Sequence, residues 1–361
     1  MKILNKKRKR LEFILIVMVF SLFFSPQAEA EEPSAPAATE EIQEMDTLEG
    51  ETMTMSGAGA ELPPVSPSAI GGAFSSLMSG SFKTDLATGA ATLNIPIVVP
   101  PGRKNVQPNI ALSYSSGNAN GICGVGWAFS VPAIQRSAKK GVPRYDDTDN
   151  FVVGGGELVK ISEVGDEYEY RAKIESSFTK YLYSGADNEW IAYDKNGTQY
   201  HFGSTEASQM VHPTNPNYIF AWYIDRVTDV YGNTMTYTYE KEDNSVYLKY
   251  VFYTSNSLCD PALNADKRIE FVYESAARPD KIYNRRAGWP SVIKRRLGKI
   301  KVSIDSDKDL LWETGEAVWI YNLSYVLSAD TSRSLLNSIQ LEDSKGNTLP
   351  AKIFTYQALE P

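Results

Sequence analysis

The chain has 361 residues, with 36 basic and 44 acidic side chains and a formal net charge of −8. This length is enough for one large or two ordinary domains with a sizeable core. The acidic balance argues against a nucleic-acid partner, because such a partner requires a basic face on the protein.

Residues 1–30 follow the three-part plan of a secretory signal peptide. A basic stretch, residues 1–10, is followed by an apolar stretch, residues 11–24, and Ala28-Glu29-Ala30 is typical of a cleavage site. The apolar stretch is shorter than the ~20 residues that a membrane-spanning helix needs. We therefore expect an exported protein that meets the membrane only through this peptide, before cleavage. An uncleaved membrane anchor stays open as the alternative.

Residues 31–67 are rich in Ala, Glu, Pro, Thr and Ser and have no apolar period. Such a segment cannot bury enough apolar surface to offset the entropy lost on ordering. We expect a disordered acidic linker here, followed by a single folded domain over residues 68–361.

From about residue 81 the apolar residues alternate with polar ones. In residues 91–99, 110–114, 269–273 and 319–327, every second side chain is apolar or aromatic. Alternation with a period of two is the signal of half-buried strands. No stretch of ten or more residues in this region has the 3.6-residue period of a helix. The prediction is an all-β fold, a long antiparallel β-meander or curved sheet.

Three turns share one sequence pattern, in residues 193–202, 228–239 and 342–356. An acidic residue comes first, then a glycine with an asparagine beside it, then a threonine. Gly232 and Asn233 show the pattern most clearly. We expect the glycine to supply a positive φ at the tip of a hairpin and the acidic or asparagine side chain to close the turn.

A glycine-rich run, residues 116–127, reads SGNANGICGVGW. It lacks the Lys-Ser/Thr of a phosphate-binding Walker loop. Gly121, Gly124 and Gly126 also stand in the wrong order for a dinucleotide-binding fingerprint, and the residues beyond them indicate a strand rather than a helix. We interpret the run as a tight loop packed by Trp127.

Cys123, inside this loop, and Cys259 are the only cysteines. A nucleophilic cysteine needs a nearby base to lower its pKa, and neither His201 nor His212 is close to Cys123 in sequence. Both a disulfide and two free thiols stay open for an exported chain. Two cysteines and two histidines at these positions do not have the ligand spacing of a zinc site.

An acidic run, residues 305–316, is a candidate calcium loop. Five carboxylates fall on ligand positions 1, 3, 5, 9 and 12 of an EF-hand loop, namely Asp305, Asp307, Asp309, Glu313 and Glu316. Position 6, where the sharp turn needs glycine, is Leu310, and the flanks resemble strands instead of helices. The favoured interpretation is therefore a solvated acidic hairpin loop. A second acidic run, residues 145–150, is interpreted as a polar turn.

Other motifs favour structure over catalysis. Residues 167–170 (EYEY) have the Glu-x-Glu spacing of arginine-specific ADP-ribosyltransferases, but strand alternation explains them better. The basic run of residues 294–296 is typical of a solvated strand edge. The sequence holds neither a Gly-x-Ser-x-Gly elbow nor an HExxH helix. Nothing in it indicates an enzyme.

Taken in chain order, several linked motifs resemble the opening of the Salmonella virulence plasmid B (SpvB) family. The same domain begins the TcaC/TcdB-like B components of insecticidal toxin complexes. The resemblance spans about residues 70–358. The motifs include a Pro-Pro-Gly-Arg turn, an Asn-Gly-x-x-Gly-x-Gly-Trp loop and the Gly-Asn hairpins, with the signature residues Pro101, Gly102, Arg103, Gly121, Gly124, Gly126, Trp127, Gly232 and Asn233.

The resemblance implies a non-catalytic structural module without a cofactor or small-molecule substrate. In such toxin complexes, its strands join those of an Rhs-repeat C component to enclose a toxic segment. The resemblance also implies that ADP-ribosylation belongs to a separate C-terminal domain of the family. We expect a secreted module that assembles with an Rhs or toxin-complex partner, released outside the cell, in the periplasm or at the surface.

Several alternatives stay open. One is a surface adhesion or glycan-binding β-domain, and another is the remnant of an ADP-ribosyltransferase toxin. The sequence also leaves open whether the chain is a stand-alone domain, a truncated gene product or a fragment.

Overall fold

A computed structural model of the chain describes residues 83–86, 88–312 and 316–357. The expected signal peptide (1–30), the expected linker (31–67) and the first part of the expected domain (68–82) lie outside the described residues. Within the described ranges two 3-10 turns have defined bounds, Arg103–Asn105 and Glu206–Ser208, and no α-helix is present. No helix in these ranges has the length and apolar character needed to cross a membrane.

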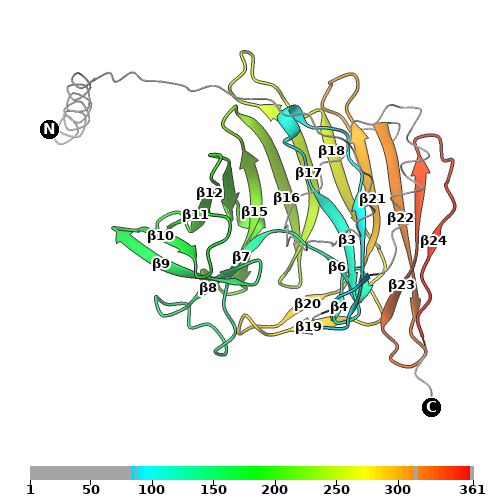
Figure 1. Cartoon of the computed structure of the whole chain (residues 1–361), viewed down its shortest axis with the longest axis horizontal. Coiled ribbons are helices and arrows are strands. Elements are labelled where there is room, and N and C mark those ends of the chain that lie inside the picture. The colour runs from blue at the N-terminus through cyan, green and yellow to red at the C-terminus, as the bar shows by residue number, and fades with distance from the viewer. Residues whose placement is uncertain (1–82, 87, 313–315, 358–361) are drawn as a thin grey trace, which may run out of the picture. The chain divides into compact units, whose positions relative to one another are not determined.

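Eight strands of the largest sheet close into a ring (Figure 1). In pairing order they are β7 (Ala133–Arg136), β8 (Phe151–Val153), β9 (Gly156–Val164), β10 (Glu167–Ala172), β11 (Lys180–Ser184), β12 (Glu189–Tyr193), β13 (Gln199–Phe202) and β15 (Asn215–Thr228). The ring closes because β15 pairs with both β13 and β7. The short strand β14 (Gln209–His212) also pairs with β15.

The same sheet continues from β15 as an open antiparallel meander. Its further strands are β16 (Asn233–Glu242), β17 (Ser245–Asn256), β18 (Lys267–Tyr273), β21 (Leu297–Ile304), β22 (Ala317–Leu327), β23 (Ser334–Asp343) and β24 (Lys352–Ile353). Each of these strands pairs with the one before it in this order. The prediction of an all-β antiparallel meander is confirmed, and the closure of its first half into a ring is an addition that the sequence did not indicate.

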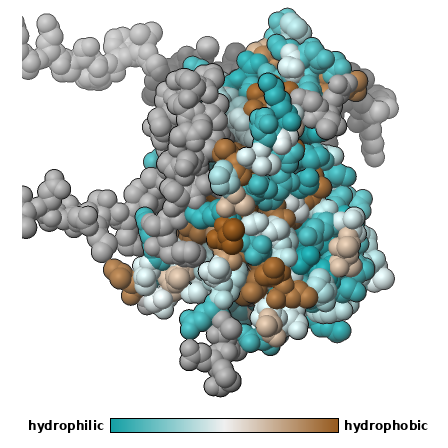
Figure 2. Space-filling model, turned by 90° about the vertical axis from the view of Figure 1, so that its right-hand side faces the viewer, coloured by the Kyte–Doolittle hydropathy of each residue, from teal (hydrophilic) through white to brown (hydrophobic). Residues whose placement is uncertain are grey.

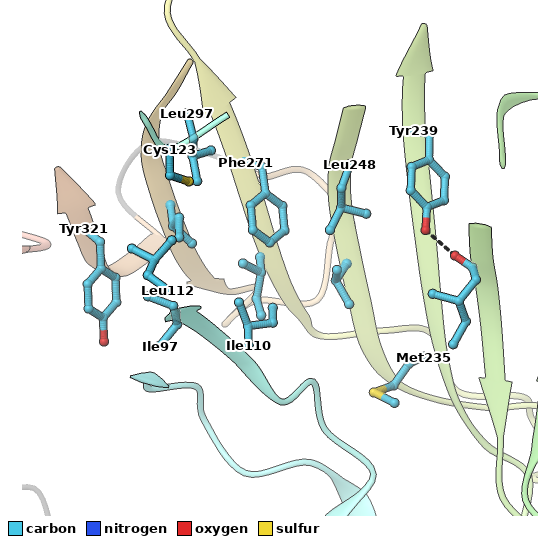
Figure 3. Close-up of a cluster of buried hydrophobic side chains, with 14 of the residues drawn as sticks. Ile97, Ile110, Leu112, Cys123, Met235, Tyr239, Leu248, Phe271, Leu297 and Tyr321 are labelled. Carbon is cyan, nitrogen blue, oxygen red and sulfur yellow. Dashed lines mark hydrogen bonds between the residues drawn. The ribbon is translucent and has the colours of Figure 1, made fainter. Parts of the chain in front are cut away.

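A second, four-stranded sheet covers one face of the open meander. Its strands are β1 (Lys83–Thr84), β2 (Ala91–Ile97), β3 (Ile110–Ser115) and β6 (Trp127–Phe129). Ile97, Ile110 and Leu112 of this sheet meet Phe271 and Tyr321 of the meander in a buried core (Figure 3). The alternating apolar positions thus face another sheet, as in a β-sandwich. Two hairpins complete the fold, β4 (Asn120–Gly121) with β5 (Gly124–Val125) and β19 (Ile282–Asn284) with β20 (Ser291–Ile293).

Aromatic side chains pack together between the strands of the ring. The Trp190 ring lies 4.9 Å from Phe151 and 6.1 Å from Trp222, measured between centroids. Both tryptophans are fully buried. Arg136 adds its guanidinium 5.1 Å from the Phe151 ring and forms a 2.9 Å ion pair with Asp149. The ring is therefore held together by a packed aromatic core.

The repeated turn has one hydrogen-bond pattern at all three places. Gly197, Gly232 and Gly346 have φ values of +82°, +79° and +82°. Each donates its N–H to the carbonyl oxygen of the aspartate three residues earlier. At the second turn, Asp229 Oδ1 also accepts the N–H of Asn233 at 2.8 Å, and Oδ2 accepts its side-chain amide at 2.8 Å.

We expect Asp229→Ala to lower the free energy of unfolding by about 1–2 kcal/mol, because it leaves donors of the half-buried turn without an acceptor. The matched control is Asp343→Ala, which removes the same bonds from the exposed third turn and is expected to cost less. Urea unfolding measures both as shifts in midpoint at constant m-value. Equal losses at the two turns would contradict the role of burial.

Candidate functional site

The glycine-rich run folds into the β4–β5 hairpin and lies against other strands. Gly124 and Gly126 have φ values of +90° and +81°, in the left-handed region that favours glycine. A Cβ on Gly124 would lie 2.8 Å from the carbonyl oxygen of Ser334, and one on Gly126 would lie 2.4 Å from the Tyr114 ring. The loop therefore approaches its neighbours too closely for any side chain at these two positions.

Trp127, directly after the loop, is buried in the core. Its Nε1 donates a hydrogen bond of 2.9 Å to the Tyr356 hydroxyl, and its ring lies 4.8 Å from that of Phe354. The loop is thus joined to the segment that follows β24, far away in the sequence. The expected packing role of Trp127 agrees with these contacts.

A buried polar cluster fixes the position of the hairpin. The Arg278 guanidinium donates to the Gly121 carbonyl oxygen at 2.8 Å and to the Asn120 side chain at 3.0 Å. Asp280 accepts two bonds from Arg278, one from the Asn120 amide, and two from the N–H and hydroxyl of Ser334. We call these four residues, Asn120, Arg278, Asp280 and Ser334, the arginine cluster.

Burial opposes ionisation of Asp280, but the hydrogen bonds from Arg278, Ser334 and Asn120 outweigh it and hold the pKa of this carboxyl well below its usual range. Sequence reasoning did not single out Arg278 or Asp280. They stand in an ordinary Arg-Pro-Asp stretch, and only the long-range contact with Asn120 reveals their role.

Cys123 lies inside the core beside Leu297 (Figure 3). Burial raises the pKa of its thiol to about 12, against a weaker lowering by Arg278. A thiol of this kind stays protonated at neutral pH and is a poor nucleophile. Cys259 is exposed, and both cysteines are free thiols. The structure therefore favours two free thiols over a disulfide.

A thiol reagent such as Ellman's reagent tests this assignment. The native chain at pH 8 is expected to release about one equivalent of chromophore quickly, from Cys259, and the second only after unfolding. Cys259→Ser should abolish the fast reaction, while Cys123→Ser should leave it unchanged. A fast reaction that survives in Cys259→Ser would contradict the burial of Cys123.

The Pro-Pro-Gly-Arg turn is anchored to strand β17. Gly102 donates its N–H to the Gln107 side chain at 2.8 Å, and a Cβ on Gly102 would lie 2.0 Å from the Val106 carbonyl oxygen. Arg103 Nε donates to the Thr254 carbonyl oxygen at 2.9 Å. Pro101, which precedes both residues, is exposed. This turn thus connects the two sheets.

The turn at Gly232 and Asn233 is likewise joined to β17. The Asn233 side chain is buried and accepts a 2.9 Å bond from the Asn256 amide, which also donates to the Tyr231 carbonyl oxygen. A Cβ on Gly232 would lie 2.6 Å from the Leu258 side chain. These two signature residues therefore connect a hairpin to its neighbouring strand.

The side chains of the basic run and of the EYEY stretch form ion pairs and packing contacts within the fold. Lys294, Arg295 and Arg296 each pair with a carboxylate. Tyr170 packs its ring 5.0 Å from Trp190, while Glu169 on the same strand pairs with Lys180. Alternation along β10 explains the Glu-x-Glu spacing.

The acidic runs differ from each other in the structure. In residues 145–150, Asp149 accepts bonds from Arg136 and from the N–H groups of Arg144 and Tyr145, which makes this run a closed polar turn. In residues 305–316, Asp305, Asp307 and Asp309 each place a carboxylate oxygen within 4.8 Å of the others, and Glu313 lies outside the described residues. Glu316 is not part of that group, and its Oε1 accepts the N–H of Ser306 at 3.2 Å.

The sequence matches the family described as Salmonella virulence plasmid 65kDa B protein (SpvB) over residues 85–268. A curated relative, the mono(ADP-ribosyl)transferase SpvB of Salmonella choleraesuis (strain SC-B67), is 30% identical over 43% of this chain. The chain covers 30% of the length of that relative.

Two solved structures have the same fold. The crystal structure of TcdB2-TccC3 matches with a TM-score of 0.67 and 21% identity, over 78% of this chain and 17% of that one. The N-terminal domain of the effector protein SpvB from Salmonella typhimurium strain LT2 matches with a TM-score of 0.58 and 22% identity, over 68% of this chain and 98% of that one.

Proposed function

The chain belongs to the SpvB family of Salmonella virulence plasmid 65kDa B proteins, and on that premise we propose that it is a non-catalytic structural module of a toxin complex. In this proposal it assembles with an Rhs-type or toxin-complex polypeptide and helps to enclose a toxic segment. The observation that carries the proposal is the fold, which corresponds to 98% of the SpvB N-terminal domain but to only 17% of a TcdB2-TccC3 chain.

The signature residues support a structural role. Gly124, Gly126 and Trp127 pack against other strands, and Arg103 and Asn233 tie turns to β17. Their contacts join strands and turns to one another. Cys123, the candidate nucleophile of the loop, is buried with a raised pKa. Turnover of labelled NAD by the purified chain would contradict the non-catalytic part of the proposal.

The open end of the meander offers an edge for a partner. The last strand, β24, pairs with β23 through only two residues, Ser338 and Ile339. Large apolar side chains are exposed on β22, on β24 and before β24; they are Val326, Leu327, Leu349 and Ile353. Figure 2, which faces this end of the sheet, shows hydrophobic residues in brown among hydrophilic ones in teal. An exposed strand edge with apolar side chains is a template for strand addition by another chain.

Co-expression with an Rhs-type chain encoded nearby tests the assembly. We expect the two chains to elute together in size-exclusion chromatography. Ile353→Lys should weaken the complex at least about tenfold, because it places a charge in the added-strand interface. Ile174→Lys, at an even more exposed position between β10 and β11, is the control and should leave the complex intact. A chain that stays monomeric with every such partner would refute the proposal.

Export through residues 1–30 is part of the same proposal. Fused to a reporter that is active only outside the cytoplasm, these residues should make it active, and N-terminal sequencing of the released chain should begin at Glu31. Replacing Leu15 by Arg in the apolar stretch should block export, whereas replacing Lys6 by Arg should not. A reporter that stays inactive would contradict export by this segment.

A second candidate function, glycan binding, draws on one cavity of about 260 Å³ lined by residues of β7 to β11 and their turns. Its lining includes Tyr168, Tyr170 and Asp146. Tyrosine faces beside carboxylates suit stacking and hydrogen bonding with sugars. Saturable binding on a glycan array that is lost in Tyr168→Ala would favour this function over a shell module.

A further inference from the structure

The loop between β21 and β22 gathers three carboxylates at one place. Asp305, Asp307 and Asp309 each have a carboxylate oxygen within 4.8 Å of those of the other two. We call these residues the aspartate triad. Three like charges this close repel one another unless a cation lies between them. An acidic cluster is a common surface feature and does not by itself indicate a ligand.

Asp305 differs from the other two aspartates because it is buried. Its side chain is only 2% exposed, although Asp307 and Asp309 lie at the surface. Oδ2 accepts the N–H of Leu310 at 3.0 Å. Oδ1 is buried and has no hydrogen-bond partner among the described residues. A buried carboxylate oxygen without a donor is costly, and such groups are normally paired or bound to a metal.

The backbone of the loop has the conformation that a glycine at position 6 would normally supply. Leu310 replaces the glycine that position 6 of an EF-hand loop needs. In the structure Leu310 nevertheless has a φ of +66°, in the left-handed region. It thereby presents its N–H to Asp305. The turn that normally requires glycine is thus formed by leucine, and the loss of glycine does not exclude a ligand here.

We propose that the aspartate triad binds one Ca²⁺ ion. An all-oxygen donor set with no histidine or cysteine suits a hard cation and not zinc. Calcium accepts six to eight oxygen ligands in flexible geometry, so three carboxylates leave room for backbone carbonyls and water. Magnesium demands a stricter octahedron at shorter distances. Bound calcium would hold the loop that directly follows the core strand β21.

Isothermal titration of the full chain, first dialysed against EDTA, tests this site with CaCl₂ and separately with MgCl₂. We expect one calcium site with a Kd of about 10⁻⁶ to 10⁻³ M, the range of sensor and extracellular sites, and weaker binding of magnesium. Saturating calcium should also raise the Tm by about 5 °C or more.

The variants Asp307→Asn and Asp309→Asn change exposed residues and should fold normally. Each is expected to weaken calcium binding at least tenfold. The matched control is Asp146→Asn, which removes the same charge from the other acidic turn and should leave binding unchanged.

Asp305→Asn is expected to affect the unfolding temperature differently in EDTA and in calcium. In EDTA it should unfold at the same temperature as the unchanged chain or at a higher one, because it removes an uncompensated buried charge. In calcium it should unfold at a lower temperature than the unchanged chain. The proposal is overturned if the folded chain shows neither heat nor a Tm shift in 10 mM CaCl₂. It is equally overturned if Asp307→Asn and Asp309→Asn bind calcium as tightly as the unchanged chain.

Discussion

Asp280→Ala is expected to lower the free energy of unfolding by about 3–5 kcal/mol, since it leaves the buried Arg278 without its counter-charge. Arg278 is 1% exposed, and its guanidinium shares two hydrogen bonds with Asp280. The same change removes the acceptor for both donors of Ser334. Guanidinium chloride unfolding followed by tryptophan fluorescence measures the loss.

Two comparisons make this result specific to the arginine cluster. The double variant Arg278→Met with Asp280→Ala should be more stable than the sum of the two single variants predicts, because it removes both charges together. Glu163→Ala breaks an ion pair with Lys160 at the surface, where such pairs contribute little, and should cause no measurable loss. Strict additivity in the double variant would show that the pair is not coupled.

The same carboxyl predicts a dependence on pH. The pKa of Asp280 is lowered in the folded chain, so its contribution to stability is present above the ordinary aspartate pKa of about 3.9. This contribution is lost as the pH falls from there through the lowered folded-state value. The free energy of unfolding of Asp280→Ala should therefore fall less steeply than that of the unchanged chain below about pH 4.

Trp190→Ala is expected to destabilise the ring by about 3–5 kcal/mol, because it opens a large cavity in the aromatic core. Trp190 is fully buried and lies within 5.0 Å of the rings of Phe151, Tyr170 and Tyr183. No equivalent side chain can move in to fill that space, since its neighbours are fixed on paired strands. Thermal unfolding measured by calorimetry reports the loss.

A matched pair of phenylalanine variants separates packing from hydrogen bonding. Trp222 Nε1 donates to the Asn188 carbonyl oxygen at 2.8 Å, whereas Trp190 Nε1 is buried without a partner among the described residues. Trp222→Phe should therefore cost about 1 kcal/mol more than Trp190→Phe, which removes an unsatisfied donor. The reverse order would show that a bond to Trp190 exists in solution.

Local features were predictable from the sequence because their causes lie close together in the chain. At the repeated turns, Asp229 and Asn233 are four residues apart, and the turn chemistry is complete within that distance. Strand alternation likewise predicted the buried faces of β2 and β3, since side chains two residues apart share one face of a strand. The linked motifs also identified the family.

The remaining features depend on contacts between distant segments. The pairing of Trp222 on β15 with Ile134 on β7 closes the ring, and periodicity says nothing about which strands become neighbours. Cys123 could be placed in a loop from the sequence, but its raised pKa follows from burial against strands far along the chain. The candidate calcium loop is a further case, because the sequence does not reveal that Asp305 Oδ1 is buried without a hydrogen-bond donor.

The sequence by itself determined that this is an antiparallel all-β protein of the SpvB family. Strand alternation, turn chemistry and family motifs each depend on residues only a few positions apart. Only the tertiary structure decided that the first half closes into a ring around an aromatic core. It also decided that Arg278 and Asp280 hold the glycine loop. The physical reason is that burial and the hydrogen bonds of the arginine cluster depend on residues more than a hundred positions apart, such as Asn120 and Arg278, which only the folded chain brings into contact.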